Sequence, residues 1–298
     1  MAEQKIELRK IRDFGVNIND TFVFLRQNLK PLLKSFFAIC AVFMLGQAIF
    51  TGLYESHTAG SILQQLFSGR IRPGTNNRPL SNLFSIEYLM LVIFMMLTSA
   101  SMKVALGAYI KYYLENNGQQ PGIDEVWTIF KKYFFKVFLY SILIDIMIII
   151  GCIFCLAPGI YLAVAFTAFP FVIMIEDADF NAAFNRCFEI IKANFWPSLA
   201  LYLVAYIIYS FSGSIVGMVV GTVVGLVSYF TTKDVSTTVG LVTSFLNIFS
   251  FIFYTVFFIS AALQYFSLTE QRDGTGILNR IDAIGTGKNN FDHTEEQY

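Results

Sequence analysis

The chain has 298 residues, of which 55% are hydrophobic and only 14% are charged, and its formal net charge is zero. Soluble domains carry about 25% charged residues, so this composition argues against an ordinary soluble domain. The balanced charge gives no reason to expect nucleic acid as a partner. We therefore expect an all-α, polytopic membrane protein surrounded by membrane lipid.

Apolar stretches along the chain predict the membrane-spanning helices. A helix needs about 20 apolar residues to cross a hydrocarbon core of about 30 Å. The stretches that meet this length lie at 34–54, 86–110, 135–156, 159–176, 197–229 and 240–266. The expected organisation is an amphipathic N-terminal segment (1–33), a six-span membrane domain (34–266) with an outer loop at about 55–85, and a tail (267–298) with a disordered end.

An amphipathic pattern occurs three times. Residues 18–31 (INDTFVFLRQNLKP), 123–136 (IDEVWTIFKKYFFK) and 184–197 (FNRCFEIIKANFWP) carry apolar side chains at i, i+4, i+7 and i+11. This spacing is typical of an amphipathic helix, and two predicted spans follow each copy. We therefore expect three repeats, each an interfacial amphipathic helix plus a transmembrane hairpin, with the apolar face of the helix in the lipid or the bundle.

Lys and Arg are concentrated in these three segments and in the tail, whereas few lie in the segments between them. Cytoplasmic segments of membrane proteins carry an excess of Lys and Arg. We therefore expect both termini to lie in the cytoplasm.

Two charged residues lie inside predicted spans. Lys103 precedes Lys111 by two helical turns, and Asp145 follows Lys136 by a similar length. Both therefore lie about 12–14 Å deep, which suggests an intramembrane charged pair. Such charges are costly and are candidates for function. One reading is a proton or substrate relay. The other is a structural ion pair, or a Lys103 that reaches toward the interface while Asp145 meets hydroxyl groups.

The fourth span ends in an acidic cytoplasmic cluster, Glu176, Asp177 and Asp179. The cluster could bind a cation or a partner, but three carboxylates without further ligands are weak signals for a metal. We favour a clamp onto basic residues of the interfacial helices, such as Arg186 or Lys131. Pro170 within the same span should bend the helix, which could open a cavity beside the bundle.

A glycine stripe marks the fifth span, where Gly213, Gly217, Gly221 and Gly225 follow one another at intervals of four. Small residues at this spacing let helices in lipid approach closely, as in a glycine zipper. The stripe could pack within this bundle, on the sixth span, or could serve self-association or a membrane-protein partner.

Catalytic and metal-binding motifs are not found in the sequence. Cys152 and Cys155 form a C-x-x-C, but no His or further Cys lies nearby, which favours two small apolar residues over a metal or redox site. We expect no catalytic residues, no metal and no cofactor.

The stretch from 158 to 197, PGIYLAVAFTAFPFVIMIEDADFNAAFNRCFEIIKANFWP, resembles the membrane-domain family found fused to some bacterial glycerophosphodiester phosphodiesterases. In that family a span ends in an acidic pair, here Glu176 and Asp177, and an amphipathic helix leads into the next span. The closing AALQYFSLTEQRDGTGILNRIDAIG is similar to stand-alone relatives in Bacteroidetes-type bacteria. The resemblance implies a bacterial inner-membrane module without the catalytic barrel.

These features lead to two functional hypotheses. The first is a non-enzymatic scaffold or accessory subunit of a membrane protein complex, which rests on the repeats, the glycine stripe and the missing catalytic motifs. The alternative is a transporter or lipid-handling protein that uses Lys103 and Asp145.

Overall fold

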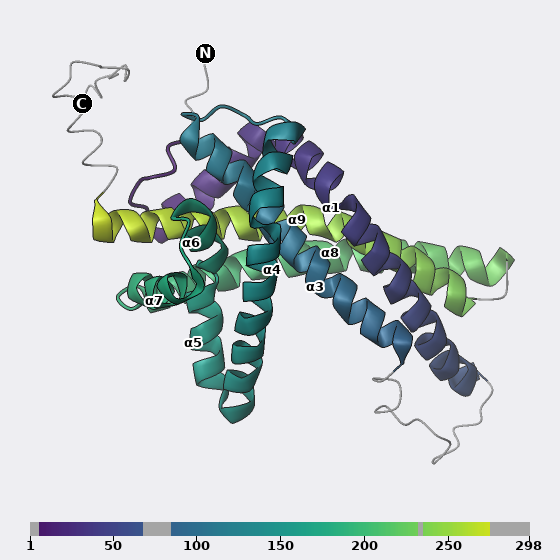
Figure 1. The fold of residues 1–298 in the computed structure, drawn as a ribbon. Coiled ribbons are helices and arrows are strands. Elements are labelled where there is room, and N and C mark those ends of the chain that lie inside the picture. Colours follow the sequence, from purple (N-terminus) through teal and green to yellow (C-terminus); the bar gives the residue numbers. More distant parts are fainter. Residues whose placement is uncertain (1–5, 68–84, 232–234, 275–298) are drawn as a thin grey trace.

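The computed structural model describes residues 6–67, 85–231 and 235–274, and this part of the chain is helical throughout, without strands (Figure 1). The helices are α1 (Phe14–Phe67), α3 (Ile86–Glu115), α4 (Ile123–Phe154), α5 (Leu156–Phe166), α6 (Phe169–Ile175), α7 (Phe180–Ile191), α8 (Phe195–Thr231) and α9 (Val235–Asp273).

Six of the described helical segments are long and apolar enough to cross a membrane, with α5 and α6 together forming the fourth. This confirms the expected all-α class and the expectation of six helices that are long and apolar enough to span a membrane. Large apolar side chains on these helices point outward, most of all at the turn between α4 and α5, where Phe154 is 86% exposed. A soluble protein would bury such residues, whereas hydrocarbon solvates them.

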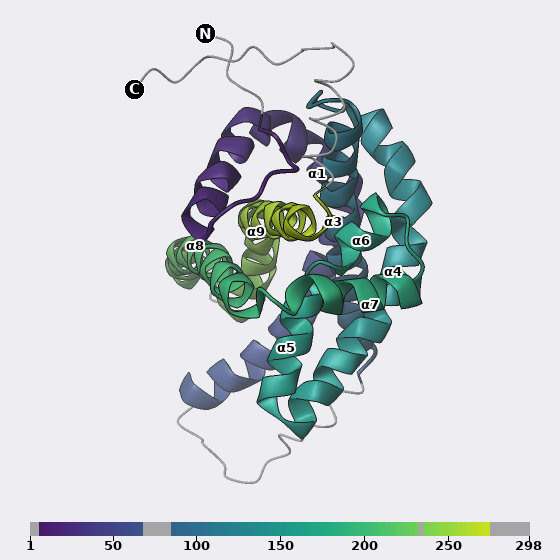
Figure 2. The same ribbon diagram turned by 90° about the vertical axis from the view of Figure 1, so that its left-hand side faces the viewer.

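The helices pack as successive pairs. α1 lies against α3, α4 against α5, and α8 against α9, while α1 and α9 also pack against each other. Figure 1 shows the α4–α5 pair projecting from the rest, and Figure 2 shows α9 between α8 and α3. The first and last helices of the chain are therefore neighbours at the centre of the fold.

The predicted amphipathic helices differ in how they are built. Residues 18–31 and 123–136 continue without interruption into the following spans, as the first parts of α1 and α4. Only the third copy includes a separate helix, α7. The first part of α1 is set at an angle to the remainder (Figure 2), and Pro31 lies inside this helix, where its missing N–H favours a bend.

The expected outer loop, at about 55–85, includes helical residues, since α1 runs on to Phe67. α8 is assigned as one helix from Phe195 to Thr231. The segment 68–84 and the tail from 275 onward lie outside the described residues.

The first part of α1 buries polar side chains. Asn17, Thr21 and Asn28 are buried, whereas Phe22 and Leu29 are 48% and 40% exposed. Asn28 accepts a hydrogen bond from the Tyr109 hydroxyl of α3 at 3.1 Å. The predicted apolar positions are therefore divided, because Leu25 is buried in the core while Phe22 and Leu29 are exposed.

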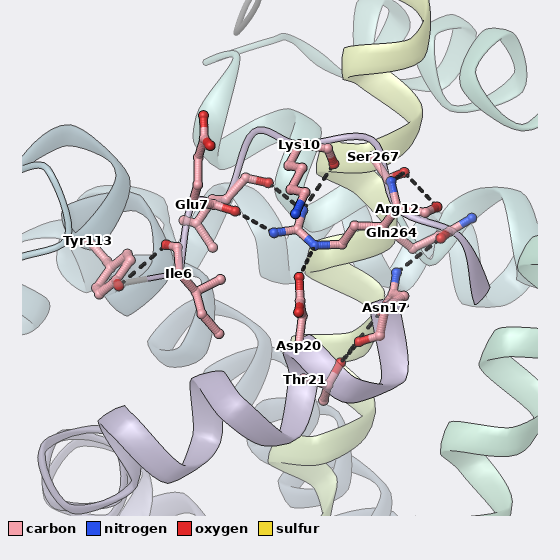
Figure 3. Close-up of polar contacts among 11 residues, drawn as sticks. Ile6, Glu7, Lys10, Arg12, Asn17, Asp20, Thr21, Tyr113, Gln264 and Ser267 are labelled. Atoms are coloured by element: carbon pink, nitrogen blue, oxygen red, sulfur yellow. Dashed lines mark hydrogen bonds and ion pairs between the residues drawn. The ribbon is translucent and has the colours of Figure 1, made fainter. Parts of the chain in front are cut away.

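An N-terminal segment, residues 6–13, folds back around the guanidinium of Arg12 (Figure 3). The Arg12 side chain has no exposed surface and donates from Nε to Asp20 at 2.8 Å. Its terminal nitrogens donate to the carbonyls of Leu8 at 2.8 Å, Lys10 at 3.0 Å and Glu7. A buried guanidinium is tolerated only when its donors are satisfied, and here the chain's own carbonyls satisfy them.

This segment also attaches to the last helix. The backbone N–H of Arg12 donates to Ser267 Oγ at 2.9 Å, and Ser267 Oγ donates to the Arg12 carbonyl at 3.2 Å. One turn away, Asn17 donates to Gln264 at 3.1 Å, and Gln264 donates to Ser198 of α8 at 2.9 Å. Hydrogen bonds thus join α1, α9 and α8 at the end of the bundle that carries the N-terminal segment, which we call the terminal face.

We predict that Arg12→Met lowers the free energy of unfolding by about 3 kcal/mol or more, because it leaves Asp20 and several carbonyls without their partner. The measurement is thermal unfolding of the purified protein in detergent. Lys132→Met is the matched control, since its ion pair with Asp177 at 3.4 Å is exposed and such pairs contribute about 0–1 kcal/mol. Equal losses in both variants would contradict the role assigned to Arg12.

Candidate functional site: a polar cavity beside a broken helix

The fourth span is broken near its middle. α5 ends at Phe166 and α6 begins at Phe169, with a turn between them. Pro170 follows the turn and has no N–H, so the Phe166 carbonyl lacks the donor that a continuous helix would supply. The Phe171 N–H bonds the Ala168 carbonyl at 3.0 Å, which tightens the start of α6. The predicted effect of Pro170 on this helix is confirmed.

α6 is held in place at its other end. Lys111 of α3 donates to the Met174 carbonyl at 2.6 Å and to the Tyr133 hydroxyl of α4 at 3.1 Å. Three helices therefore meet at this one ammonium group, and it satisfies a backbone carbonyl of the last turn of α6.

α7 covers the break with aromatic side chains. The ring of Phe166 lies 5.2 Å from that of Phe184 and 5.4 Å from that of Phe188. Ala183 and Cys187, on the same helix, are fully buried. The apolar face of this predicted interfacial helix therefore packs into the bundle.

A partly open cavity of about 160 Å³ lies beside the break. α3, α4, α5, α6 and α9 all contribute to its walls. Its polar lining consists of Lys103, Ser141, Asp145, Thr167 and Tyr254. The remaining lining is apolar and consists of Ile144, Ile148, Ala163, Phe166, Phe169, Pro170, Phe257, Phe258 and Ala261. An apolar pocket with a few converging polar groups is the usual form of a small-molecule site.

The structure brings Lys103 and Asp145 to this one cavity. Among the described residues, neither side chain has an ion pair within 4.0 Å, so the expected direct pair is not formed. Both side chains are only partly buried, because the cavity is open to them. Two side chains of opposite charge thus line one cavity without an ion pair between them.

Hydroxyl groups complete the polar lining. Thr167 donates to the Ala163 carbonyl at 2.8 Å, which leaves its oxygen able to accept a hydrogen bond. Ser141 lies one turn before Asp145 on α4, and Tyr254 comes from α9. Sequence reasoning did not single out these three residues, because hydroxyl side chains are frequent in the spans and only the fold brings these to Lys103. The spacing of Ser141 and Asp145 by four was a local signal that could have indicated one of them.

The acidic cluster, which the sequence predicts on the cytoplasmic side, lies on the terminal face. Glu176 accepts a hydrogen bond from the Tyr265 hydroxyl of α9 at 2.8 Å and pairs with Arg186 of α7 at 3.3 Å. Arg186 also pairs with Asp273, at the end of α9. These contacts join the end of α6 to α7 and α9. Arg186 is one of the basic residues expected from the sequence to pair with the acidic cluster.

The other two acidic residues pair with α4. Asp177 lies 3.4 Å from Lys132, and Asp179 lies 3.5 Å from Lys136. A hydrogen bond from the Tyr133 hydroxyl and the charge of Lys132 hold the pKa of Asp177 below its usual range. Asp177 also has φ 52°, a left-handed conformation that ends α6 and that Asp tolerates better than most residues.

The glycine stripe is divided by its surroundings. A Cβ atom at Gly213 would lie 3.1 Å from Ser250 Oγ of α9, so this glycine permits close packing on the sixth span. A Cβ atom at Gly217 would meet no atom within 4 Å. The side-chain surroundings of Gly221 and Gly225 lie outside the described residues.

Within the described residues, no group of three or more His, Cys, Asp or Glu side chains is arranged to hold a metal ion. Cys152 and Cys155 are exposed at the α4–α5 turn as free thiols. Comparisons of the chain with protein families, with curated proteins and with solved structures find no match. The resemblance noted from the sequence therefore stays a prediction.

We predict that neutralising either cavity charge does not destabilise the protein. Lys103→Met and Asp145→Asn each remove a charge that has no ion pair among the described residues, so the melting temperature in detergent should stay constant or rise. A structural ion pair would behave differently, since breaking a buried pair costs about 3–5 kcal/mol. A large fall in melting temperature for both variants would therefore make the charges structural.

Proposed function

We propose that this protein is a transporter or lipid-handling protein, which binds a small polar ligand in the cavity and passes it along the bundle. The observation that carries the proposal is the pair of charges, Lys103 and Asp145, that share a cavity of about 160 Å³ without an ion pair. Intramembrane charges that face a cavity mark substrate or ion pathways in membrane proteins.

The broken fourth span gives independent support. Discontinuous helices near the bilayer midplane often form the binding sites of transporters, because the break frees backbone groups to face a ligand. Irregular backbone at membrane depth is tolerated only in protein or beside a polar cavity. Here the break at Thr167 and Pro170 lies on the cavity wall.

We predict that the cavity is wet and reachable from both sides of the membrane. The background is a variant with all four native cysteines changed to serine. In this background, Ser141→Cys should react with a membrane-impermeant methanethiosulfonate trimethylammonium reagent at least tenfold faster than Ser101→Cys, which is buried in the core. The measurement is labelling of sealed vesicles of both orientations. Equal rates at the two positions would show a dry cavity and overturn the proposal.

The proposed setting is a bacterial inner membrane with both termini in the cytoplasm. Support comes from the basic residues of the terminal face, among them Lys131, Lys132 and Arg186, since Lys and Arg favour the cytoplasmic side. We expect Gln119→Cys, in the α3–α4 connection, to react with an impermeant maleimide only after spheroplasts are opened. Ile86→Cys, at the other end of α3, should react in intact spheroplasts. The reverse pattern would invert the topology.

A scaffold or accessory subunit is the second candidate, and Gly217 is the observation that favours it. Among the described residues, no atom lies within 4 Å of a Cβ atom placed at this position, and Ile215, Met218 and Val219 beside it are exposed. A neighbouring helix, from a partner or from a second copy, could approach closely here.

Two glycine variants test this second candidate. Gly213→Leu should lower the melting temperature, because its side chain would meet Ser250. Gly217→Leu should leave the melting temperature unchanged but dissociate any stoichiometric complex, measured by native mass spectrometry of gently purified protein. If the wild-type protein and Gly217→Leu have the same assembled mass, the scaffold candidate is wrong.

A further inference from the structure

The cavity contains one cationic and one anionic side chain, and this balance restricts the chemistry of its ligand. Lys103 offers ammonium donors, Asp145 offers carboxylate acceptors, and Ser141, Thr167 and Tyr254 add hydroxyl groups. All other lining residues are apolar. A ligand must therefore be small, must interact with both the positive and the negative side chain, and must place no charged group against the apolar walls.

A ligand with a single charge would satisfy only half of this site. An anion bound to Lys103 would leave Asp145 without a partner and would also be repelled by it, and a cation bound to Asp145 would have the same effect on Lys103. In a low-dielectric environment such an uncompensated charge costs several kcal/mol. A ligand that carries both an ammonium and an anionic group avoids this cost.

We propose that the cavity binds a small zwitterion, with the ammonium group of the ligand at Asp145 and its carboxylate or phosphate at Lys103. The proposal rests on the proposed ligand-binding function and names the class of ligand. An engineered cavity of about 150 Å³ holds benzene, so about 160 Å³ suits a ligand of about six heavy atoms. This is the size of an alpha-amino acid, or of most of the headgroup of phosphatidylethanolamine.

Both sources share the same chemistry, and the partly open cavity admits either. A free amino acid would enter whole. A lipid would place only its headgroup inside, with its acyl chains outside against apolar helix surfaces.

The test is ligand binding by the full-length protein in nanodiscs made of phosphatidylglycerol alone. The probes are L-alanine and O-phosphoethanolamine as zwitterions, propionate as an anion and ethylammonium as a cation. Binding is measured by calorimetry and by the shift in melting temperature, because a ligand that binds the folded state raises it. A second set of nanodiscs contains phosphatidylethanolamine, and native mass spectrometry counts the lipids that stay bound.

We expect at least one zwitterionic probe to bind, with affinity at least tenfold higher than propionate or ethylammonium. Lys103→Met and Asp145→Asn should each reduce that affinity at least tenfold. Lys132→Met and Asp177→Asn are matched controls, since they neutralise an exposed ion pair outside the cavity, and should keep it. Binding of L-alanine indicates a free solute, whereas retention of phosphatidylethanolamine alone indicates a lipid headgroup.

Three results would overturn the zwitterion proposal. These are equal binding of a singly charged probe, unchanged zwitterion affinity in both cavity variants, and no binding of a zwitterion either as a free solute or as a lipid headgroup. Binding of propionate or ethylammonium that depends on Lys103 or Asp145 would still support the proposed function. Rapid labelling of Ser141→Cys from both sides, without any zwitterion binding, would likewise overturn only the ligand class.

Discussion

The fold depends on one constraint, which is that hydrocarbon offers no hydrogen-bond partner to a polar group. The first part of α1 meets this constraint by turning Asn17, Thr21 and Asn28 inward, where Gln264 and Tyr109 bond two of them. The ammonium of Lys111 meets it for the end of α6 by bonding a backbone carbonyl. Several polar groups in this protein are thus contacts that join helices, while large apolar side chains lie both in the core and on the outer surface. The charges of Lys103 and Asp145 differ from these groups, because neither side chain forms an ion pair within 4.0 Å among the described residues.

The two halves of the fourth span, α5 and α6, pack against different neighbours. α6 is attached to α3 and α4 through Lys111 and to α7 and α9 through Glu176. α5 packs mainly against α4, with which it forms the projecting hairpin. The cavity lies where these two units meet, so a shift between them would change its shape. A binding site at such a junction is sensitive to the position of every helix around it.

Much of the fold could be predicted from the sequence, because the spans depend on local apolar runs that are visible without tertiary information. The break in the fourth span could also be predicted, because Pro170 has no backbone N–H whatever its surroundings. The burial of Asn17 and Asn28 could not be predicted, because it is favourable only once α9 and α3 supply hydrogen-bond partners. The sequence predicted a similar depth for Lys103 and Asp145. Whether the two side chains touch depends on how α3 and α4 are rotated about their own axes, and no local sequence pattern specifies this rotation. Ser141, Thr167 and Tyr254 were missed for the same reason.

The hydrogen bonds between Arg12 and Ser267 have a consequence for biosynthesis. They join residues 255 positions apart, and at 5–20 residues per second the ribosome needs roughly 13–50 s to make the chain between them. During this interval the N-terminal segment exists without the helix that it binds. The terminal face can therefore close only after α9 has been made, so the contacts of Arg12 with this helix form late in the synthesis of the chain.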